Sequence, residues 1–245
     1  MKLRYYLCLV SALCIYLMAT DKPKVRVGVK RKFFEQELQR QIPSVLDLIF
    51  STIHSHNNAS FNELVRRFAI DINVQNDEGE TFLMAAVRAG NLELVNQLLA
   101  RRDIDPDLAD NDGITPLMAA IILDDNEIAE LLIHGMATLG IIDEEANTAL
   151  LHAVERNNDF IVSMLIDLGG DTVLGNQIND QGMTALMLAV QKGNTNIVSK
   201  ILDLSDIEIN KTNSKGQSAL SVARSSTHAN KDAIIKLLIA RGARE

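Results

Sequence analysis

Residues 112–120 read DGITPLMAA, and apolar residues follow them at helical spacing at Ile128, Leu131 and Leu132. Versions of this stretch recur along most of the chain. Its Thr recurs at Thr81, Thr115, Thr148 and Thr184, and a Ser takes its place at Ser218. The intervals between these positions are 34, 33, 36 and 34 residues. A Leu two places later and an Ala five places later return with it. Self-similarity at such a period indicates a stacked repeat architecture, and it outranks any local interpretation of the sequence.

Each copy predicts a tight turn followed by two short helices. In four copies a Gly stands two places before the Thr or Ser, where a tight turn can require a positive φ. Thr115 is placed to cap the first helix, and Pro116 suits the first helical position. After a break such as Gly90-Asn91, a second helix carries its apolar residues as a stripe at helical period. One unit of this size cannot bury its stripe alone, so the units must stack.

These residues resemble the ankyrin-repeat family, whose pattern is roughly D-x-x-G-x-T-P-L-H-x-A. The resemblance covers about residues 43–245, and it is specific because five copies agree in register. It implies an all-α fold, a solenoid of stacked helix-turn-helix units with short hairpin connectors. The family's His is replaced in every copy, by Met84, Met118, Leu151, Met187 and Ser221. The hydrogen bonds that this His makes between neighbouring turns are therefore missing, which suggests a less stable solenoid than a consensus array.

The pattern also predicts the domain organisation. We expect a signal peptide or short membrane anchor at residues 1–20, a basic linker and short helix at 21–42, and the ankyrin-repeat domain at 43–245. Within that domain, residues 43–76 form a degenerate repeat that caps the stack. The full repeats are expected at 77–110, 111–143, 144–179, 180–212 and 213–245. Insertions lengthen the third full copy at residues 169–176 and the last copy at residues 225–229.

The N-terminus differs from the rest of the chain. Lys2 and Arg4 precede a largely apolar run at residues 5–19, which is typical of a secretory signal peptide. A membrane-spanning helix needs about 20 apolar residues, so the run is marginal as an anchor. Residues 21–32 carry a net charge of +5, and positive charge favours the cytoplasmic side, so a cytoplasmic-facing anchored scaffold stays open as an alternative. We expect the chain to be exported, periplasmic or secreted, or to be anchored to the membrane by its N-terminus.

Charge and composition exclude several classes of partner. The chain has a formal net charge of −8, while residues 1–20 carry +2 and residues 21–32 carry +5, so the remainder must carry −15. An acidic array repels phosphate backbones, which excludes nucleic acid as a partner. Aromatic residues make up only 4%, with no Trp, which poorly suits stacking on sugars or single-stranded nucleic acid. Residues 5–19 and the basic linker could contact membrane lipids instead.

The sequence carries no recognisable catalytic motif, since it lacks a phosphate loop, a G-x-S-x-G elbow and an H-E-x-x-H helix. His54 and His56 lack the three or four ligands that zinc needs, so we expect neither a metal nor a cofactor. His152 is interpreted as an ordinary helix-surface partner of Glu155. An accessory factor or enzyme that uses the 169–176 loop is an alternative function.

The resemblance implies a non-catalytic scaffold that binds another protein on its concave surface, formed by the turn tips and the exposed side of the first helices. Most side chains expected there are polar, but four are apolar: Ile114, Ile122, Leu123 and Met183. Arg88, Glu155 and Arg156 would supply a charged rim, and an apolar centre with such a rim is typical of a protein–protein interface. The alternative is that the four apolar side chains pack on neighbouring repeats. We expect the protein to be a monomer.

Overall fold

The computed structural model describes residues 45–135, 137–169 and 175–244. The segments predicted at residues 1–20 and 21–42 lie outside the described residues, and so does the predicted start of the repeat domain at residue 43. The chain divides into two compact units, Met1–Asp47 and Leu48–Glu245. Of the first unit only residues 45–47 are described, and they are helical. The repeats all lie in the second unit, which is described below by itself.

The second unit is built from pairs of antiparallel helices. Residues 48–54 are helical and are followed by α3 (Asn58–Phe68). The later pairs are α4 (Phe82–Arg88) with α5 (Leu92–Leu99), α6 (Pro116–Ile122) with α7 (Asn126–His134), α8 (Ala149–Glu155) with α9 (Asp159–Gly169), α11 (Ala185–Lys192) with α12 (Thr195–Leu202), and α13 (Ala219–Ser225) with α14 (Lys231–Ala240). The other described residues form turns, isolated β-bridges and a helical segment at 175–176, but no strand, so the all-α prediction is confirmed.

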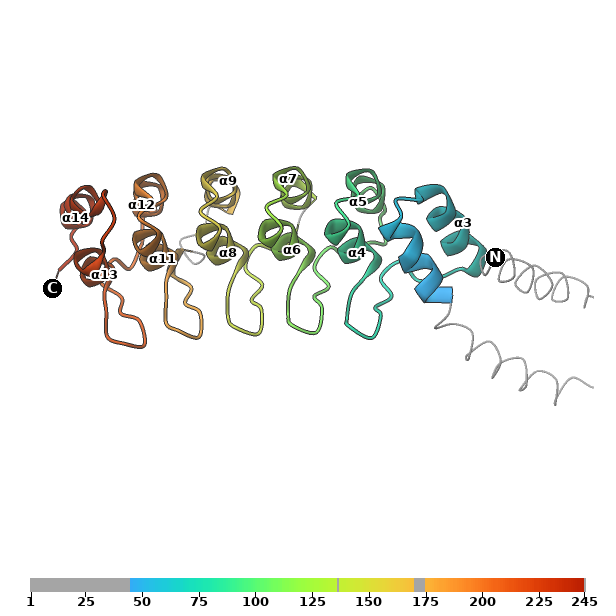
Figure 1. The fold of residues 1–245 in the computed structure, drawn as a ribbon, viewed down its shortest axis with the longest axis horizontal. Coiled ribbons are helices and arrows are strands. Elements are labelled where there is room, and N and C mark those ends of the chain that lie inside the picture. Colours follow the sequence, from blue (N-terminus) through green and yellow to red (C-terminus); the bar gives the residue numbers. More distant parts are fainter. Residues whose placement is uncertain (1–44, 136, 170–174, 245) are drawn as a thin grey trace, which may run out of the picture. The chain divides into compact units, whose positions relative to one another are not determined.

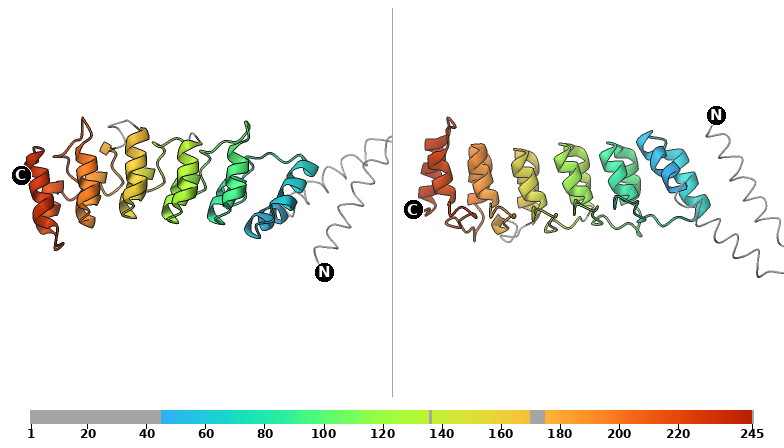
Figure 2. Two further views of the ribbon diagram at one scale, coloured as in Figure 1. Left: turned by 90° about the horizontal axis from the view of Figure 1, so that it is seen from above. Right: turned by 60° about the horizontal axis from the view of Figure 1, so that its bottom comes forward.

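The pairs stack into two layers of helices. The first helix of each pair packs on the first helix of the next pair, which makes an inner row of α4, α6, α8, α11 and α13. The second helices, α5, α7, α9, α12 and α14, form an outer row in the same way (Figure 1). The hairpins that connect the pairs project from the inner row, as the turned views also show (Figure 2).

The inner helices begin where the sequence predicts, because the recurring Thr or Ser caps each of them. The side-chain oxygen of Thr115 accepts a hydrogen bond from the amide of Met118, at 3.3 Å, and Pro116 occupies the first turn of α6. Thr81, Thr148, Thr184 and Ser218 make the same contact in the other copies. Each cap satisfies an amide that the first helical turn leaves without a partner. The predicted N-cap role of Thr115 is confirmed.

The core lies between the two layers of helices. Leu117 and Ala120 on α6 and Ile128 and Leu132 on α7 are all buried, the two helices pack on each other, and the equivalent residues are buried in the other pairs. The small Ala side chains on the inner helices allow neighbouring helices to approach closely. At the N-terminal end, the Phe82 ring packs on Phe50 and Phe61, with ring centroids 5.0 and 5.3 Å away. This aromatic cluster attaches the first helical pair to the repeat that follows it.

The hairpins are joined to one another by backbone hydrogen bonds at their tips. The amide of Asn111 donates to the carbonyl of Glu78, and the amide of Ser214 donates to the carbonyl of Gln181, both at 3.1 Å. The two junctions between them carry equivalent bonds. An Asn or Asp also closes each hairpin from within: both Asp112 and Ile114 donate their amides to Oδ1 of Asp110. The backbone bonds between the tips connect successive turns without the His that the family pattern places there.

The turn glycines are required where one hairpin meets the next. Gly182 has φ +70°, and a Cβ there would lie 2.7 Å from the amide nitrogen of Ser214. Gly216 has a similar φ of +72° but has open space around it. Ala146 takes the turn position in the third full copy and adopts φ 60°, so this copy holds an L-residue in the left-handed region.

Candidate functional site

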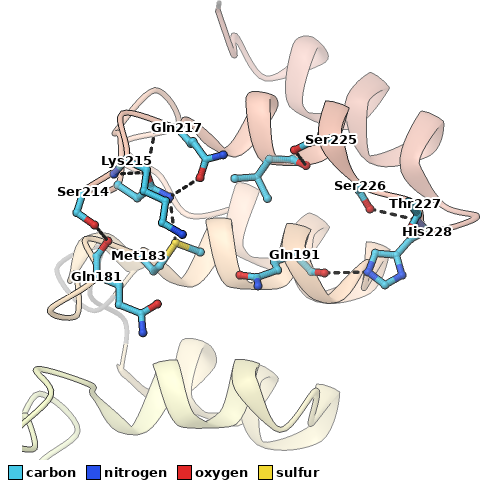
Figure 3. A pocket seen from close by; sticks show the side chains of 12 residues that line it. Gln181, Met183, Gln191, Ser214, Lys215, Gln217, Ser225, Ser226, Thr227 and His228 are labelled. Carbon is cyan, nitrogen blue, oxygen red and sulfur yellow. Dashed lines mark hydrogen bonds between the residues drawn. The ribbon is translucent and has the colours of Figure 1, made fainter.

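We call the groove the strip of the inner row that lies, by repeat register, between the hairpins and the C-terminal ends of the inner helices. At α11 and α13 this strip is hollowed into a cavity of about 570 Å³. Gln181, Lys215 and Gln217 line it from the hairpins, Gln191 and Ser225 line it from the helix ends, and Val222 lies on its floor. Figure 3 shows these two walls facing each other. By repeat register, the same groove is bordered at α6 and α8 by Ile122, Leu123, Glu155 and Arg156.

Two of the predicted apolar side chains are exposed at this border. Ile122 is the last residue of α6 and is 37% exposed, and Leu123 caps the helix and is 52% exposed. The other copies carry mostly polar pairs in these two places: Arg88-Ala89, Glu155-Arg156, Gln191-Lys192 and Ser225-Ser226. The fold therefore does not require apolar residues here, and the two side chains remain available to a partner.

The other two predicted apolar residues are less accessible, and Met183 follows the alternative interpretation, because it packs on the neighbouring repeat instead of being exposed. Met183 is only 6% exposed, and its sulfur accepts a hydrogen bond from the side-chain amide of Asn213 in the next hairpin, at 3.4 Å. Glu80 holds the same place in the first full copy and is also buried. The residue between the turn Gly and the capping Thr packs against the following hairpin, which explains this burial. Ile114 holds the same place and is half-buried.

Arg88 is part of an ion-pair network between repeats. Its guanidinium donates to Oδ2 of Asp110 at 2.6 Å and to Oε1 of Glu80 at 3.4 Å. The Asp110 side chain is only 4% exposed, and it also accepts two hairpin amides. Arg88 thus neutralises two buried carboxylates from two successive hairpins. Leaving either carboxylate buried without its cation would be strongly destabilising. The charge of Arg88 therefore stabilises the fold and is not available to a partner.

The remaining predicted charges lie at the C-terminal end of α8. Glu155 is exposed and its Oε1 accepts a hydrogen bond from Nζ of Lys192 at 2.5 Å. Arg156 is exposed, and within the described ranges its guanidinium has no hydrogen bond or ion pair. Arg156 holds the place of Leu123 one repeat further along. A free cation and an exposed apolar pair therefore occupy equivalent positions in neighbouring repeats.

His152 has a different partner from the one predicted. Its Nε2 lies 2.8 Å from Oδ2 of Asp143, rather than beside Glu155, and the Asp143 side chain is only 4% exposed. Oδ1 of the same carboxylate accepts the amides of Glu145 and Asn147. The predicted pair with Glu155 is wrong because helical spacing indicates only neighbours on the same helix, whereas the observed pair joins α8 to the hairpin before it. His152 holds the floor position of the groove that Val222 holds in the last copy.

Several accessible groups lie outside the predicted site residues. Other large apolar side chains are exposed, at Ile142, Phe160, Leu168, Ile178 and Ile239. Carboxylates are exposed at the tips of four successive hairpins, at Asp77, Glu78, Asp112, Glu144, Glu145 and Asp180. The signal for these carboxylates was present in the sequence, because they share the turn positions of the repeat.

The 169–176 loop, which the alternative function would use, lies mostly outside the described residues, because the structure does not describe residues 170–174. Asp167 beside it is exposed and pairs with Lys200, with 2.7 Å between Oδ1 and Nζ. No cluster of three or more His, Cys, Asp or Glu side chains able to hold a metal ion is found among the described residues. Among the same residues, no helix has the length and apolar character needed to cross a membrane.

Known structures resemble this chain over most of its length. One is a chain from the structure of the complex between the Bd0816 predatory endopeptidase of Bdellovibrio bacteriovorus and immunity protein Bd3460, at 28% identity and a TM-score of 0.65. That match covers 78% of this chain and 96% of the other. Another is an ankyrin repeat domain from Acinetobacter baumannii AYE, at 25% identity and a TM-score of 0.70, covering 80% and 98% respectively. No match was found among curated proteins.

The sequence also matches the family model described as "Ankyrin repeats (3 copies)" twice, over residues 52–139 and 136–213. These two ranges include more than half of the chain and contain the inner helices α4, α6, α8 and α11. Ankyrin repeats indicate a protein-interaction scaffold, and the fold is generally a non-enzymatic binding module. The chain belongs to the ankyrin-repeat family.

Proposed function

We propose that this protein is a non-catalytic scaffold that binds a partner protein in the groove along its inner helices, with Ile122 and Leu123 as the apolar anchor. The observation that carries the proposal is the exposure of these adjacent side chains, 37% and 52%, in places where the other copies are mostly polar. Interfaces concentrate their binding free energy in a few buried side chains near the centre. The anchor lies near the middle of the inner row, where a partner can bury it most completely.

Charges around the anchor define the partner further. Arg156 lies one repeat away without an ion-pair partner among the described residues, and Glu155 lies beside it. The carboxylates at the hairpin tips named above border the groove on its other side. A negative border accelerates association with a positively charged surface and disfavours acidic competitors. The partner surface that meets these tips is therefore basic.

The similar complex supports a folded protein as the partner, since it joins an endopeptidase to an immunity protein. We propose a folded protein for this chain as well, and a single copy of the chain as the binding unit. Sedimentation of the purified chain checks the second point, and a stable dimer would contradict it.

We also propose that residues 1–20 direct the chain to export or anchor it at a membrane. The basic residues before the apolar run at residues 5–19 support this proposal. Mass spectrometry of the native protein should find a start near Asp21 if the signal is removed. An intact Met1 in a chain recovered free in the cytoplasm would contradict both forms of the proposal.

The anchor is tested with the double variant Ile122→Glu and Leu123→Lys. Proteins retained by the wild-type chain from its native compartment are identified, and the leading candidate is purified for affinity measurement. Truncation of an anchor at an interface centre commonly costs about 2 kcal/mol, roughly thirtyfold in affinity. We expect the double variant to lose at least this much while its melting temperature stays close to that of the wild type.

The matched control is Leu168→Lys, which removes an equally exposed Leu from the outer helix α9. This control should retain the partner with unchanged affinity. Equal losses in the control and the double variant would contradict the groove as the binding site. A large loss of melting temperature in the double variant would show that Ile122 and Leu123 belong to the core.

A further inference from the structure

The groove changes character between its middle and its C-terminal part. Around α6 and α8 it is bordered by acidic tips and apolar side chains, whereas the cavity between α11 and α13 has no carboxylate in its lining. From this cavity we infer a second element of recognition, which rests on the proposed function. We infer that it is a subsite for a carboxylate side chain, Asp or Glu, of the partner protein.

The insertion in the last repeat builds one wall of this cavity. Five residues, 226–230, connect α13 to α14, whereas two or three residues connect the helices of the preceding pairs. The connection is fastened to the previous repeat: His228 donates from Nε2 to the carbonyl of Gln191 at 2.8 Å, and Asn230 donates to the carbonyl of Gly193 at 3.3 Å. The wall is therefore held in place by contacts with α11 and its C-terminus.

The fit between this wall and α11 is close. A Cβ on Gly193 would lie 2.7 Å from Cγ of the His228 ring. Gly193 also has φ +72°, a conformation that Gly adopts at no steric cost. The site thus combines a sequence insertion with a glycine that receives it, and it has a defined shape.

The cavity offers several hydrogen-bond donors to a ligand. The carbonyl oxygen of the Gln217 side chain accepts from Nδ2 of Asn213 at 3.1 Å, while the NH2 group of the same side chain can donate to a ligand. The hydroxyl oxygen of Ser226 accepts from the amide of His228, which leaves its hydrogen to donate. The side-chain amides of Gln181 and Gln191 add further donors on opposite walls. A ligand that accepts several hydrogen bonds suits this arrangement.

Lys215 gives the cavity its charge. It lies at the tip of the last hairpin, is exposed, and has no ion-pair partner within the described part of the chain. The four preceding tips carry carboxylates, so the sign of the charge reverses at this repeat. A carboxylate bound here accepts charge-assisted hydrogen bonds from Lys215 and from the amides, which are stronger than bonds between neutral groups. The partner would then present basic groups along the first four tips and an acidic side chain at the fifth.

The subsite is tested without the partner, by NMR titration of the full ¹⁵N-labelled chain. The probe is the capped peptide acetyl-Gly-Glu-Gly-amide, and its isostere acetyl-Gly-Gln-Gly-amide is the comparison. We expect the Glu peptide to shift the backbone resonances of Lys215, Gln217 and Gln191 with a Kd at least about fivefold lower than that of the Gln peptide. Lys215→Gln should remove this difference. Lys236→Gln is the matched control on the same repeat, outside the cavity, and should preserve it.

Equal binding of the two peptides, or an undiminished preference in Lys215→Gln, would overturn the proposal. Two further probes test the source of the anion: acetyl-Gly-Gly with a free C-terminus, and inorganic phosphate. Tighter binding of either one than of the Glu peptide would also overturn the assignment to an acidic side chain. Because no partner is needed, a failed anchor test leaves this result unaffected, and the two proposals can fail separately.

Discussion

The α6–α8 junction and the α11–α13 junction have the same framework and different surfaces. In both, a Thr or Ser caps the inner helix, a Gly or Ala turns the hairpin with positive φ, and the tips share a backbone hydrogen bond. At the helix ends, however, the first junction carries Ile122 and Leu123 where the second carries Gln191 and Lys192. The repeat determines the framework and leaves these two places free. The difference between the junctions is therefore informative about binding.

The two junctions also differ in how many neighbours support them. α6 packs between α4 and α8 in the inner row, while α13 packs on α11 alone among the described inner helices. In a repeat array, stability is approximately a sum of the repeats and their nearest-neighbour interfaces. A change at α6 should therefore weaken two interfaces, and the same change at α13 only one.

The largest expected effect follows from this difference. Leu117→Ala on α6 should destabilise the protein by about 2–5 kcal/mol, because it leaves a cavity at a fully buried site. Leu220→Ala removes the equivalent side chain from α13 and should cost less, since the last pair can open locally. Denaturant melts of both variants measure the difference. Equal losses would show that the last repeat is held as firmly as the middle.

A glycine pair sharpens the comparison at the hairpins. Gly182→Ala should destabilise the protein by about 2–4 kcal/mol, because left-handed strain adds to a clash with the amide of Ser214. Gly216→Ala has nearly the same φ but open space, so strain alone remains, about 1–2 kcal/mol. Thermal melts of the two variants separate the contributions of conformation and contact. Similar losses in both variants would mean that the hairpins relieve the clash at residue 182 without further cost.

The sequence predicted much of the framework, because every copy repeats the same local rules. The cap at Thr115 and the apolar stripe of each helix depend on contacts within one repeat, and both could be inferred from spacing. The burial of Met183 could not be inferred from spacing, since it depends on Asn213 in the following hairpin. His152 was assigned to the wrong partner for a similar reason, because Asp143 approaches it from the hairpin.

The candidate site shows the same limit. Ile122 and Leu123 were identified by comparing equivalent places in successive copies. Arg88 was identified in the same way, but its ion pairs with Glu80 and Asp110 depend on how two repeats stack. Lys215 was not singled out, because its importance appears only when the insertion at residues 225–229 is seen to enclose a cavity. Contacts between repeats are what the sequence pattern leaves unspecified.

The smallest expected effect is a gain in stability at the third full copy. Ala146 holds a left-handed conformation at φ 60° that costs an L-residue about 1–2 kcal/mol. Ala146→Gly removes this strain but adds freedom to the unfolded chain, worth about 0.4–1 kcal/mol. We expect a net stabilisation of about 1 kcal/mol, seen as a higher denaturant midpoint. A lower midpoint would indicate that the Ala146 methyl group makes a favourable contact that outweighs the strain.

Hydrogen–deuterium exchange of the chain with and without its captured partner tests the central claim most directly. The claim is that the partner occupies the groove along the inner helices. We predict added protection at residues 111–125 and 144–156, which contain the anchor and Arg156, with little change in the outer helices α5, α7 and α9. Protection concentrated on the outer helices, with none at residues 111–125, would contradict it.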